Sequence, residues 1–248
     1  MENPLHPFEL HNFAAFSLFG LDISINKAVL MMWLVVGLVA WLLVSAGSGR
    51  SLVPGKLQSL GELLVEFIRG IIHDTMGAQG MKFFPLIATL FVFILFCNML
   101  GLIPGTYTVT SQLAVTAAFA LFVYGLSLVL GFALHGVKFL GILVPPGTPG
   151  WLLPLMIPIE LVSQLARPLS LAVRLFANMT AGHVILGVLF GLTITGGLLI
   201  GWLPFVFTIA MNVLEVGIAF IQAYIFTVLT CVYLGDAMTL HGHGDHAR

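Results

Sequence analysis

One stretch of the sequence, ELVSQLARPLSLAVRLFANMTAGH at residues 160–183, places ionisable side chains among apolar ones. A helix turns by about 100° per residue, and on that helix the polar side chains fall within a sector roughly 80° wide. The members of this stripe are Glu160, Ser163, Arg167, Ser170, Arg174 and Asn178. The pattern predicts a narrow polar seam along an otherwise apolar helix.

Arg174 is the member of the stripe that packing explains least. An arginine deep in a membrane span costs roughly 2.5–3.5 kcal/mol even on a lenient scale. If the only role of Arg174 were to pair with Glu215, replacing both residues by leucine would pack the two helices equally well. Because arginine does not release its proton, Arg174 is a fixed charge that repels hydrated protons and attracts carboxylates. We therefore expect it to block proton leakage and to favour ionisation of a carboxylic acid brought beside it.

A second polar seam follows the last apolar helix. Its members are Thr208, Asn212, Glu215, Ala219, Gln222, Thr230 and Tyr233. We expect this helix and the first one to face each other. Glu215 can titrate, as can His183 at the end of the first stretch. With Asn178 and Gln222, these two residues are predicted to line a wet path to one side of the membrane. A buried, satisfied pair is the alternative.

Other members of the two seams have simpler explanations. Serine and threonine in membrane helices often join neighbouring helices through hydrogen bonds. This alternative stays open for Ser163, Ser170, Thr208 and Thr230. Arg167 lies near one end of its helix, where its long side chain can also reach the lipid headgroups.

Composition defines the surroundings of these side chains. Of 248 residues, 59% are hydrophobic and 8% are charged, whereas a soluble domain needs roughly a quarter charged. Lipid is therefore the predicted solvent for most of the chain. A net charge of −1 with no basic run gives no indication of a nucleic-acid partner. Cys97 and Cys231 lie in apolar runs and are interpreted as packing residues.

The apolar pattern predicts an all-α polytopic membrane protein with a single membrane domain. An uninterrupted apolar run predicts the first span, and leucines at helical spacing among charges predict an amphipathic surface helix. Residues 83–134 carry no charge or histidine, which predicts a hairpin of two further spans. The predicted parts are a tail at 1–27, a span at 28–47, the amphipathic segment at 51–82, a hairpin at 84–134 with arms 84–103 and 113–134, the region 151–235 and a tail at 236–248.

The region 151–235 admits two arrangements. It can form three upright spans near 152–175, 184–203 and 205–234. Alternatively, Gly196 and Gly197 form the turn of a hairpin whose arms, at about 40 residues each, are roughly 60 Å long and must tilt strongly. Hydropathy alone does not decide between them.

Orientation follows from the positive-inside rule. Four cations, Arg50, Lys56, Arg69 and Lys82, lie between the first two spans, which predicts that this side is cytoplasmic. The amino terminus and the uncharged 104–111 turn are then outside, and Lys138 and the C-terminus are cytoplasmic. The first 27 residues lack the basic start of a cleavable signal peptide, so we expect a retained tail.

The stretch at 160–183 resembles subunit a of the F-type ATP synthase, the stator of its membrane rotor. EVGIAFIQAYIFTVLTCVYL and, more weakly, NMLGLIPGTYTVTSQL are similar as well, and order and spacing agree across nearly the whole chain. The resemblance implies the long tilted hairpin, a c-ring partner, the subunit b peripheral stalk, the remaining F1Fo subunits and a bacterial inner membrane.

The resemblance also implies roles for individual residues. Arg174 matches the arginine that faces the ion-binding carboxylate of the rotating c-ring. Asn178, Gln222, His183 and Glu215 match residues of the half-channel open to the proton-rich side, whereas Glu160 and Ser163 match the region near the exit half-channel. The histidine and carboxylate are exchanged relative to many bacterial members, as in mitochondrial and alphaproteobacterial ones, which leaves open which of the two holds the proton.

A non-catalytic role without a cofactor is predicted, because no G-x-x-x-x-G-K-[ST] loop is present for ATP. Two alternative functions predict other sequence patterns. A secondary transporter predicts inverted repeats, and an intramembrane hydrolase predicts paired metal ligands such as H-E-x-x-H. The sequence displays neither pattern. The tail HGHGDHAR can in principle bind a metal, but a solvated tail is the preferred interpretation.

Overall fold

The computed structural model describes residues 12–14, 17–18, 21–22, 25–48, 55–103, 108–144 and 150–239. The first eleven residues of the predicted amino-terminal tail, Arg50, Pro104 and the HGHGDHAR tail lie outside these ranges. Before the first helix, short strands pair as two antiparallel ladders. They are β1 (Asn12–Ala14) with β4 (Ile25–Asn26), and β2 (Ser17–Leu18) with β3 (Leu21–Asp22).

Helices make up almost all of the remaining described chain. The α-helices are α1 (Lys27–Ser48), α2 (Lys56–Met76), α3 (Phe84–Gly101), α4 (Leu113–His135), α5 (Leu153–Thr195), α6 (Gly197–Ile200) and α7 (Trp202–Met238). Short 3-10 segments join them, namely η2 (Ala78–Phe83), η3 (Val109–Ser111), η4 (Gly136–Leu143) and η5 (Gly150–Leu152). Within the described residues, five helical segments are long and apolar enough to cross a membrane. The predicted all-α class is confirmed.

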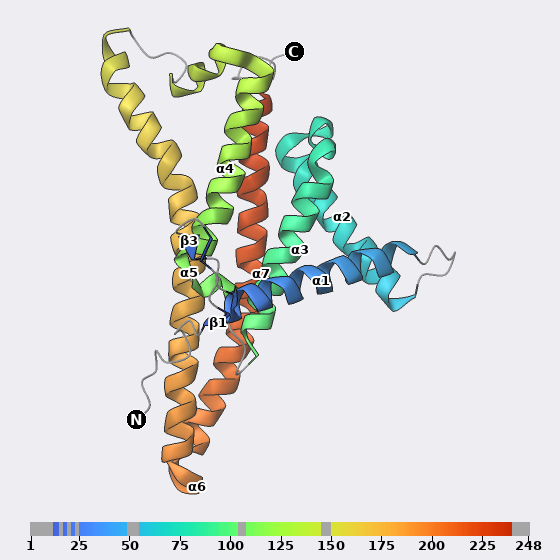
Figure 1. Cartoon of the computed structure of the whole chain (residues 1–248), viewed down its shortest axis with the longest axis vertical. Helices are drawn as coiled ribbons and strands as arrows, with labels where there is room; N and C mark the ends of the chain where they lie inside the picture. The colour runs from blue at the N-terminus through green and yellow to red at the C-terminus, as the bar shows by residue number, and fades with distance from the viewer. Residues whose placement is uncertain are drawn as a thin grey trace.

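The last region forms a hairpin rather than three upright helices. Its arms are α5, with 43 residues, and α7, with 37 residues. In Figure 1 they pack together in the lower part of the molecule and diverge toward its top. The turn contains α6 between Gly196 and Gly201. Gly197 has a φ of 57°, which favours glycine. A side chain at Gly201 would overlap the backbone carbonyls of Thr193 and Gly197, so the turn is closed tightly by glycine.

Helix α7 is the centre of the packing. It contacts α2, α3, α4 and α5 (Figure 1). Phe226 and Leu234 of α7 are almost fully buried in the core, together with Phe91 of α3 and Ile72 of α2. Because α7 is surrounded on several sides, its polar side chains cannot all reach the outer surface.

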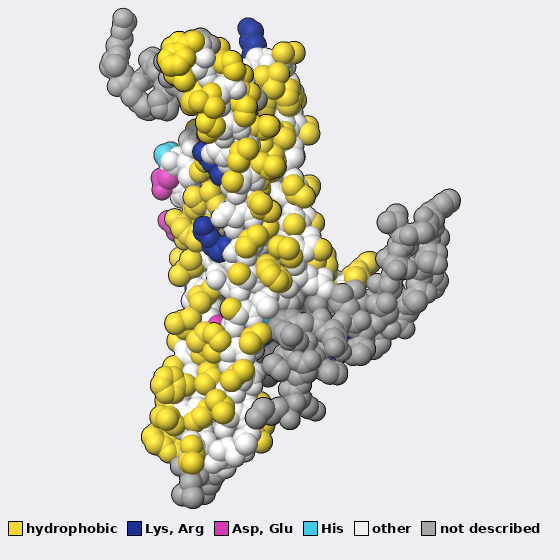
Figure 2. Space-filling view, turned by 90° about the vertical axis from the view of Figure 1, so that its left-hand side faces the viewer, with side chains coloured by type: hydrophobic (Ala, Val, Ile, Leu, Met, Phe, Trp, Pro, Cys, Tyr) yellow, Lys and Arg dark blue, Asp and Glu magenta, His cyan; other side chains and the backbone are white. Residues whose placement is uncertain are grey.

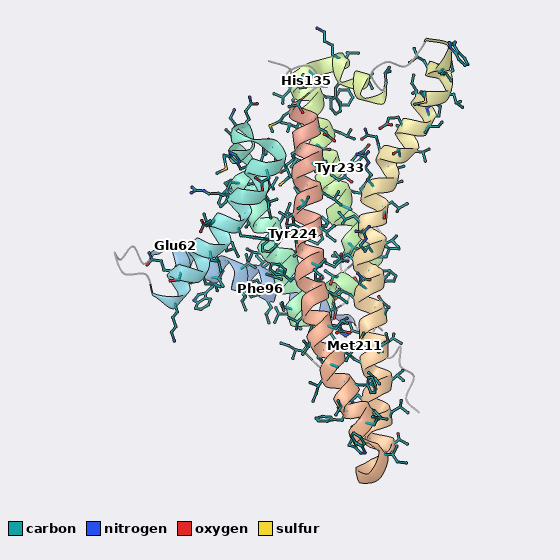
Figure 3. All side chains as sticks on the ribbon, turned by 180° about the vertical axis from the view of Figure 1, so that it is seen from behind. Glu62, Phe96, His135, Met211, Tyr224 and Tyr233 are labelled. Carbon is teal, nitrogen blue, oxygen red and sulfur yellow. The ribbon has the colours of Figure 1, made fainter. Side chains whose placement is uncertain are left out.

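Helices α1 and α2 form a separate arm. In Figure 1, α1 runs across the view while α4 and α7 follow the long axis of the molecule. Helix α2 is amphipathic: Ile68 and Ile72 are buried, whereas Glu62 and Glu66 are exposed (Glu62 is labelled in Figure 3). The arm thus contributes apolar contacts to α3 and α7 and presents its charges outward.

Candidate functional site

The polar stripe of α5 lies on the outer face of the hairpin. Figure 2 views this side, where dark-blue basic side chains lie within a largely yellow surface. Four residues of the stripe are exposed, namely Arg167, Ser170, Arg174 and Asn178. Glu160 and Ser163 are half-buried. The helical periodicity therefore places a positively charged strip on a surface that is otherwise suited to lipid or to an apolar partner.

Arg174 does not pair with a carboxylate of the described chain. Ion pairing between described residues is confined to His73 and Asp74, with 3.8 Å between Nδ1 and Oδ1. Its neighbours Val173 and Leu169 on the same helix are exposed, at 45% and 61%. The guanidinium is thus an outward cation in apolar surroundings, and it is free to meet an acid that arrives from outside this chain.

The polar seam of α7 has the opposite placement. Glu215 is 5% exposed and Gln222 is 3% exposed. Ala219, Thr230 and Tyr233 of the same seam are also buried, while Thr208 and Asn212 are half-buried. The two helices pack against each other, but the polar residues of their seams differ in exposure. Helix α5 turns its stripe outward, whereas α7 turns its seam into the bundle, where α3 and α4 also pack.

Glu215 occupies a place that only a glycine on α5 leaves open. A Cβ at Gly182 would lie 2.8 Å from Cδ of Glu215, closer than Cβ atoms approach such carbons. The Oε1 atom is buried and has no hydrogen-bond partner among the described residues. A buried polar atom without a partner is costly, at about 1–3 kcal/mol. The carboxyl group of Glu215 is therefore buried beside α5 without an ion-pair partner among the described residues.

His183 comes next to Gly182 and contacts a different part of the chain. Its Nε2 atom forms a hydrogen bond with Oγ1 of Thr108, just before η3. The Thr108 hydroxyl also lies 3.3 Å from the carbonyl oxygen of Gly101 at the end of α3. Glu215 therefore contacts α5 at Gly182, the residue that directly precedes His183. Asn178 lies on the exposed side with Arg174 rather than in this buried group.

Three further polar residues extend the buried group. Asn98 of α3 is fully buried, and its Nδ2 donates to the carbonyl of Ala219 at 3.4 Å. Thr110 donates to Oδ1 of Asn98 at 2.9 Å, and Ser111 donates to the carbonyl of Thr108 at 2.7 Å. The two polar stripes in the sequence do not include these residues. Their signal was the polar content of NMLGLIPGTYTVTSQL, which lies in a region otherwise read as spans and a turn.

The two polar groups differ in what they can do. The buried group contains titratable side chains among hydroxyls and amides, an arrangement that can pass protons. The outer group carries a permanent cation, which can act only on charges brought to it. Within the described part of the chain, His, Cys, Asp and Glu are not gathered into a set of three or more that could hold a metal.

The fold and this site define a polytopic helical membrane protein with ionisable groups both inside the bundle and on one outer face. The model of the family described as ATP synthase A chain matches residues 29–235. The chain belongs to this family.

Curated relatives agree with this assignment. ATP synthase subunit a of Rhodospirillum rubrum is 46% identical over 241 residues, covering 97% of this chain and 100% of the relative. ATP synthase subunit a of Magnetococcus marinus is 48% identical over 246 residues, or 96% of this chain and 94% of the relative. ATP synthase subunit a of Allorhizobium ampelinum is 45% identical over 247 residues, covering 97% of this chain and 99% of the relative.

Proposed function

We propose that this chain is the stator subunit of an ATP synthase membrane sector and that it couples proton translocation to the rotation of a c-ring. Arg174 is its fixed cation. The buried group around His183, Glu215 and Gln222 is the inlet half-channel, and Asn178 lies where that path meets the exposed stripe. Glu160 and Ser163 belong to the exit half-channel. Membership of the ATP synthase A chain family supports the assignment.

The mechanism follows from the difference between titratable and fixed charge. A proton from the outer side passes the Glu215 and His183 pair and neutralises a carboxylate of the ring, which can then enter lipid without the cost of a bare charge. After nearly a full turn the carboxylate releases its proton toward Glu160 and passes Arg174 as an anion. Arg174 keeps the two half-channels from joining, because its charge repels protons.

The energy scale explains why a rotor is needed. Each charge that crosses the membrane supplies about 2.3 kcal/mol per 100 mV. Synthesis of one ATP must therefore pool several crossings, and the chain itself lacks a nucleotide-binding loop. We propose that it is not catalytic on its own, and that it works with a c-ring, a subunit b peripheral stalk and the other F1Fo subunits.

We also propose the setting in which the chain works. It lies in a bacterial inner membrane, with its amino terminus outside and its C-terminus in the cytoplasm. The cations around α2 support this orientation, since Lys56, Arg69 and Lys82 lie on one connection between apolar helices.

The observation that carries the proposal is the outward placement of Arg174 with no carboxylate of the described chain within ion-pair distance. Its test is Arg174→Ala in the assembled complex, measured as ATP-driven proton pumping in membrane vesicles. We expect coupled pumping to be lost. The control Val173→Ala removes an exposed apolar neighbour and should pump normally. Coupled pumping by Arg174→Ala would disprove the central role of this residue.

A further inference from the structure

The connection between α3 and α4 brings a hydroxyl group to α5. Its short segment η3 packs against α3, α4 and α5, and Thr108 directly precedes that segment. Thr108 is 4% exposed and contacts His183 through Oγ1 and Nε2. A residue outside the long hairpin therefore sets the surroundings of one of the hairpin's titratable groups.

Both the backbone and the side chain of Thr108 are held in place. Its carbonyl oxygen accepts from the N–H of Ser111 at 3.2 Å and from the Ser111 hydroxyl at 2.7 Å. Its side chain lies against Gly101, where an added Cβ would come within 2.6 Å of Oγ1. Cβ atoms do not approach oxygen so closely, so the Thr108 hydroxyl occupies a place that only glycine leaves open.

The direction of the hydrogen bond between Thr108 and His183 follows from a third group. The Thr108 hydroxyl donates to the carbonyl oxygen of Gly101 at 3.3 Å. Gly101 is the last residue of α3, where carbonyl groups have no N–H donor within the helix, so its oxygen needs a donor from outside. A hydroxyl has one hydrogen to donate, and a carbonyl can only accept. The Thr108 oxygen therefore accepts from His183, which places a proton on Nε2.

We propose that Thr108 is a positioning residue that keeps neutral His183 in the Nε2–H form, so that protons on the inlet path enter and leave through Nδ1. This inference rests on the proposed function and specifies which nitrogen carries the transported proton. The step balances: a hydronium ion gives its proton to Nδ1, which leaves water and an imidazolium, and the imidazolium later passes the same proton onward. Nε2 keeps its own proton throughout.

A fixed tautomer lets each transport step end in the state in which it began. An imidazole that takes a proton on one nitrogen and releases one from the other finishes in the opposite tautomer, and its ring has to rotate before the next proton. Thr108 blocks that sequence. Release of the Nε2 proton would leave two acceptors facing each other, because the Thr108 hydrogen is directed at Gly101, and such an unpaired contact is costly in a buried place.

Solid-state NMR of the assembled complex in liposomes tests the tautomer directly, because the nitrogen shifts of a neutral histidine depend on which nitrogen carries the hydrogen. The complex is labelled with ¹⁵N-histidine and measured at alkaline pH, which favours neutral imidazole. A His183→Gln complex gives the reference spectrum that isolates the signals of His183. We expect the Nε2–H form in the parent complex. The Nδ1–H form, or a mixture of the two forms, would overturn the inference.

Threonine variants separate the effect of the hydroxyl from that of side-chain shape. Thr108→Val keeps the branched shape without the hydroxyl, so we expect the Nδ1–H form of His183 to become populated and proton pumping to fall severalfold. Thr108→Ser keeps the hydroxyl and should restore the Nε2–H form and most of the pumping. Thr116→Val is the matched control and should change neither quantity, because Thr116 is fully buried and its hydroxyl lies on the backbone carbonyls of Gln112 and Leu113.

Equal behaviour of Thr108→Val and Thr116→Val would refute the positioning role. A Thr108→Ser complex no better than Thr108→Val would refute it too, and so would lower pumping by Thr108→Val with an unchanged tautomer. Thr108→Ala takes the place of Thr108→Val should valine prevent assembly. The wrong tautomer in a complex that pumps protons would overturn this inference alone, whereas a parent complex that does not pump would overturn the proposed function and this inference with it.

Discussion

Gly182 of α5 lies directly against the carboxyl group of Glu215 of α7. The contact depends on the missing side chain, because a Cβ would lie 2.8 Å from the Glu215 Cδ atom. The absence of one methyl group on α5 therefore sets the position of a titratable group on α7.

Gly182→Ala should displace this carboxyl group from its place beside α5. We expect proton pumping to fall on the order of tenfold, equivalent to about 1.4 kcal/mol in a rate barrier. The measurement is ATP-driven quenching of a pH-sensitive dye in vesicles that contain the assembled complex. Gly187→Ala is the matched control, since a Cβ at that glycine of α5 meets nothing within 4 Å. Equal losses in both variants would point to a general effect of alanine in α5.

His183 and Glu215 can be tested as a pair by exchanging them. The double variant His183→Glu with Glu215→His keeps one carboxyl and one imidazole on the path, so it should pump more than His183→Ala or Glu215→Ala. Thr108, which bonds to His183, can also donate to a carboxylate at that position. Initial pumping rates, normalised to the amount of assembled complex, give the comparison. A double variant no better than the single losses would contradict a paired path.

Asn98 should contribute to stability as well as to the polar surroundings of Glu215. Asn98→Leu removes the acceptor for Thr110 and the donor for the Ala219 carbonyl. Each buried group left unpaired costs about 1–3 kcal/mol, so we expect a lower melting temperature of the purified complex. Thr89→Val on the same helix is the control, because the exposed Thr89 bonds only to the carbonyl of Pro85. An unchanged melting temperature for Asn98→Leu would show that these bonds add no stability.

Much of the architecture could be predicted because its causes are local. Long apolar runs specify membrane helices, and the 100° turn per residue gathers Arg174 and Asn178 on one face. Hydropathy could not distinguish the hairpin from three upright spans, since both have the same composition. The resemblance to subunit a of the F-type ATP synthase predicted the hairpin, and the structure shows Gly197 at positive φ in the turn.

The neighbours of each face could not be predicted in the same way. Periodicity states that Glu215 and Gln222 share a side of α7, but not that α3 and α4 as well as α5 surround that helix. Asn98 and Thr108 were missed for a related reason: uncharged side chains in an apolar stretch gain importance only when a fold brings them to His183 or Ala219. The role of each proposed site residue stays a prediction until the variants are measured.

Arg174 is exposed and Glu215 is buried, so the surroundings of these two residues of one hairpin are set by different parts of the protein. The interior carboxyl of Glu215 is buried against residues of this polypeptide, down to a single glycine. In the proposed complex, the outer guanidinium of Arg174 instead experiences the ring that docks on α5. If the proposed complex forms, substitutions in the ring would change the surroundings of Arg174 while those of Glu215 stay the same, so the two sites could evolve independently.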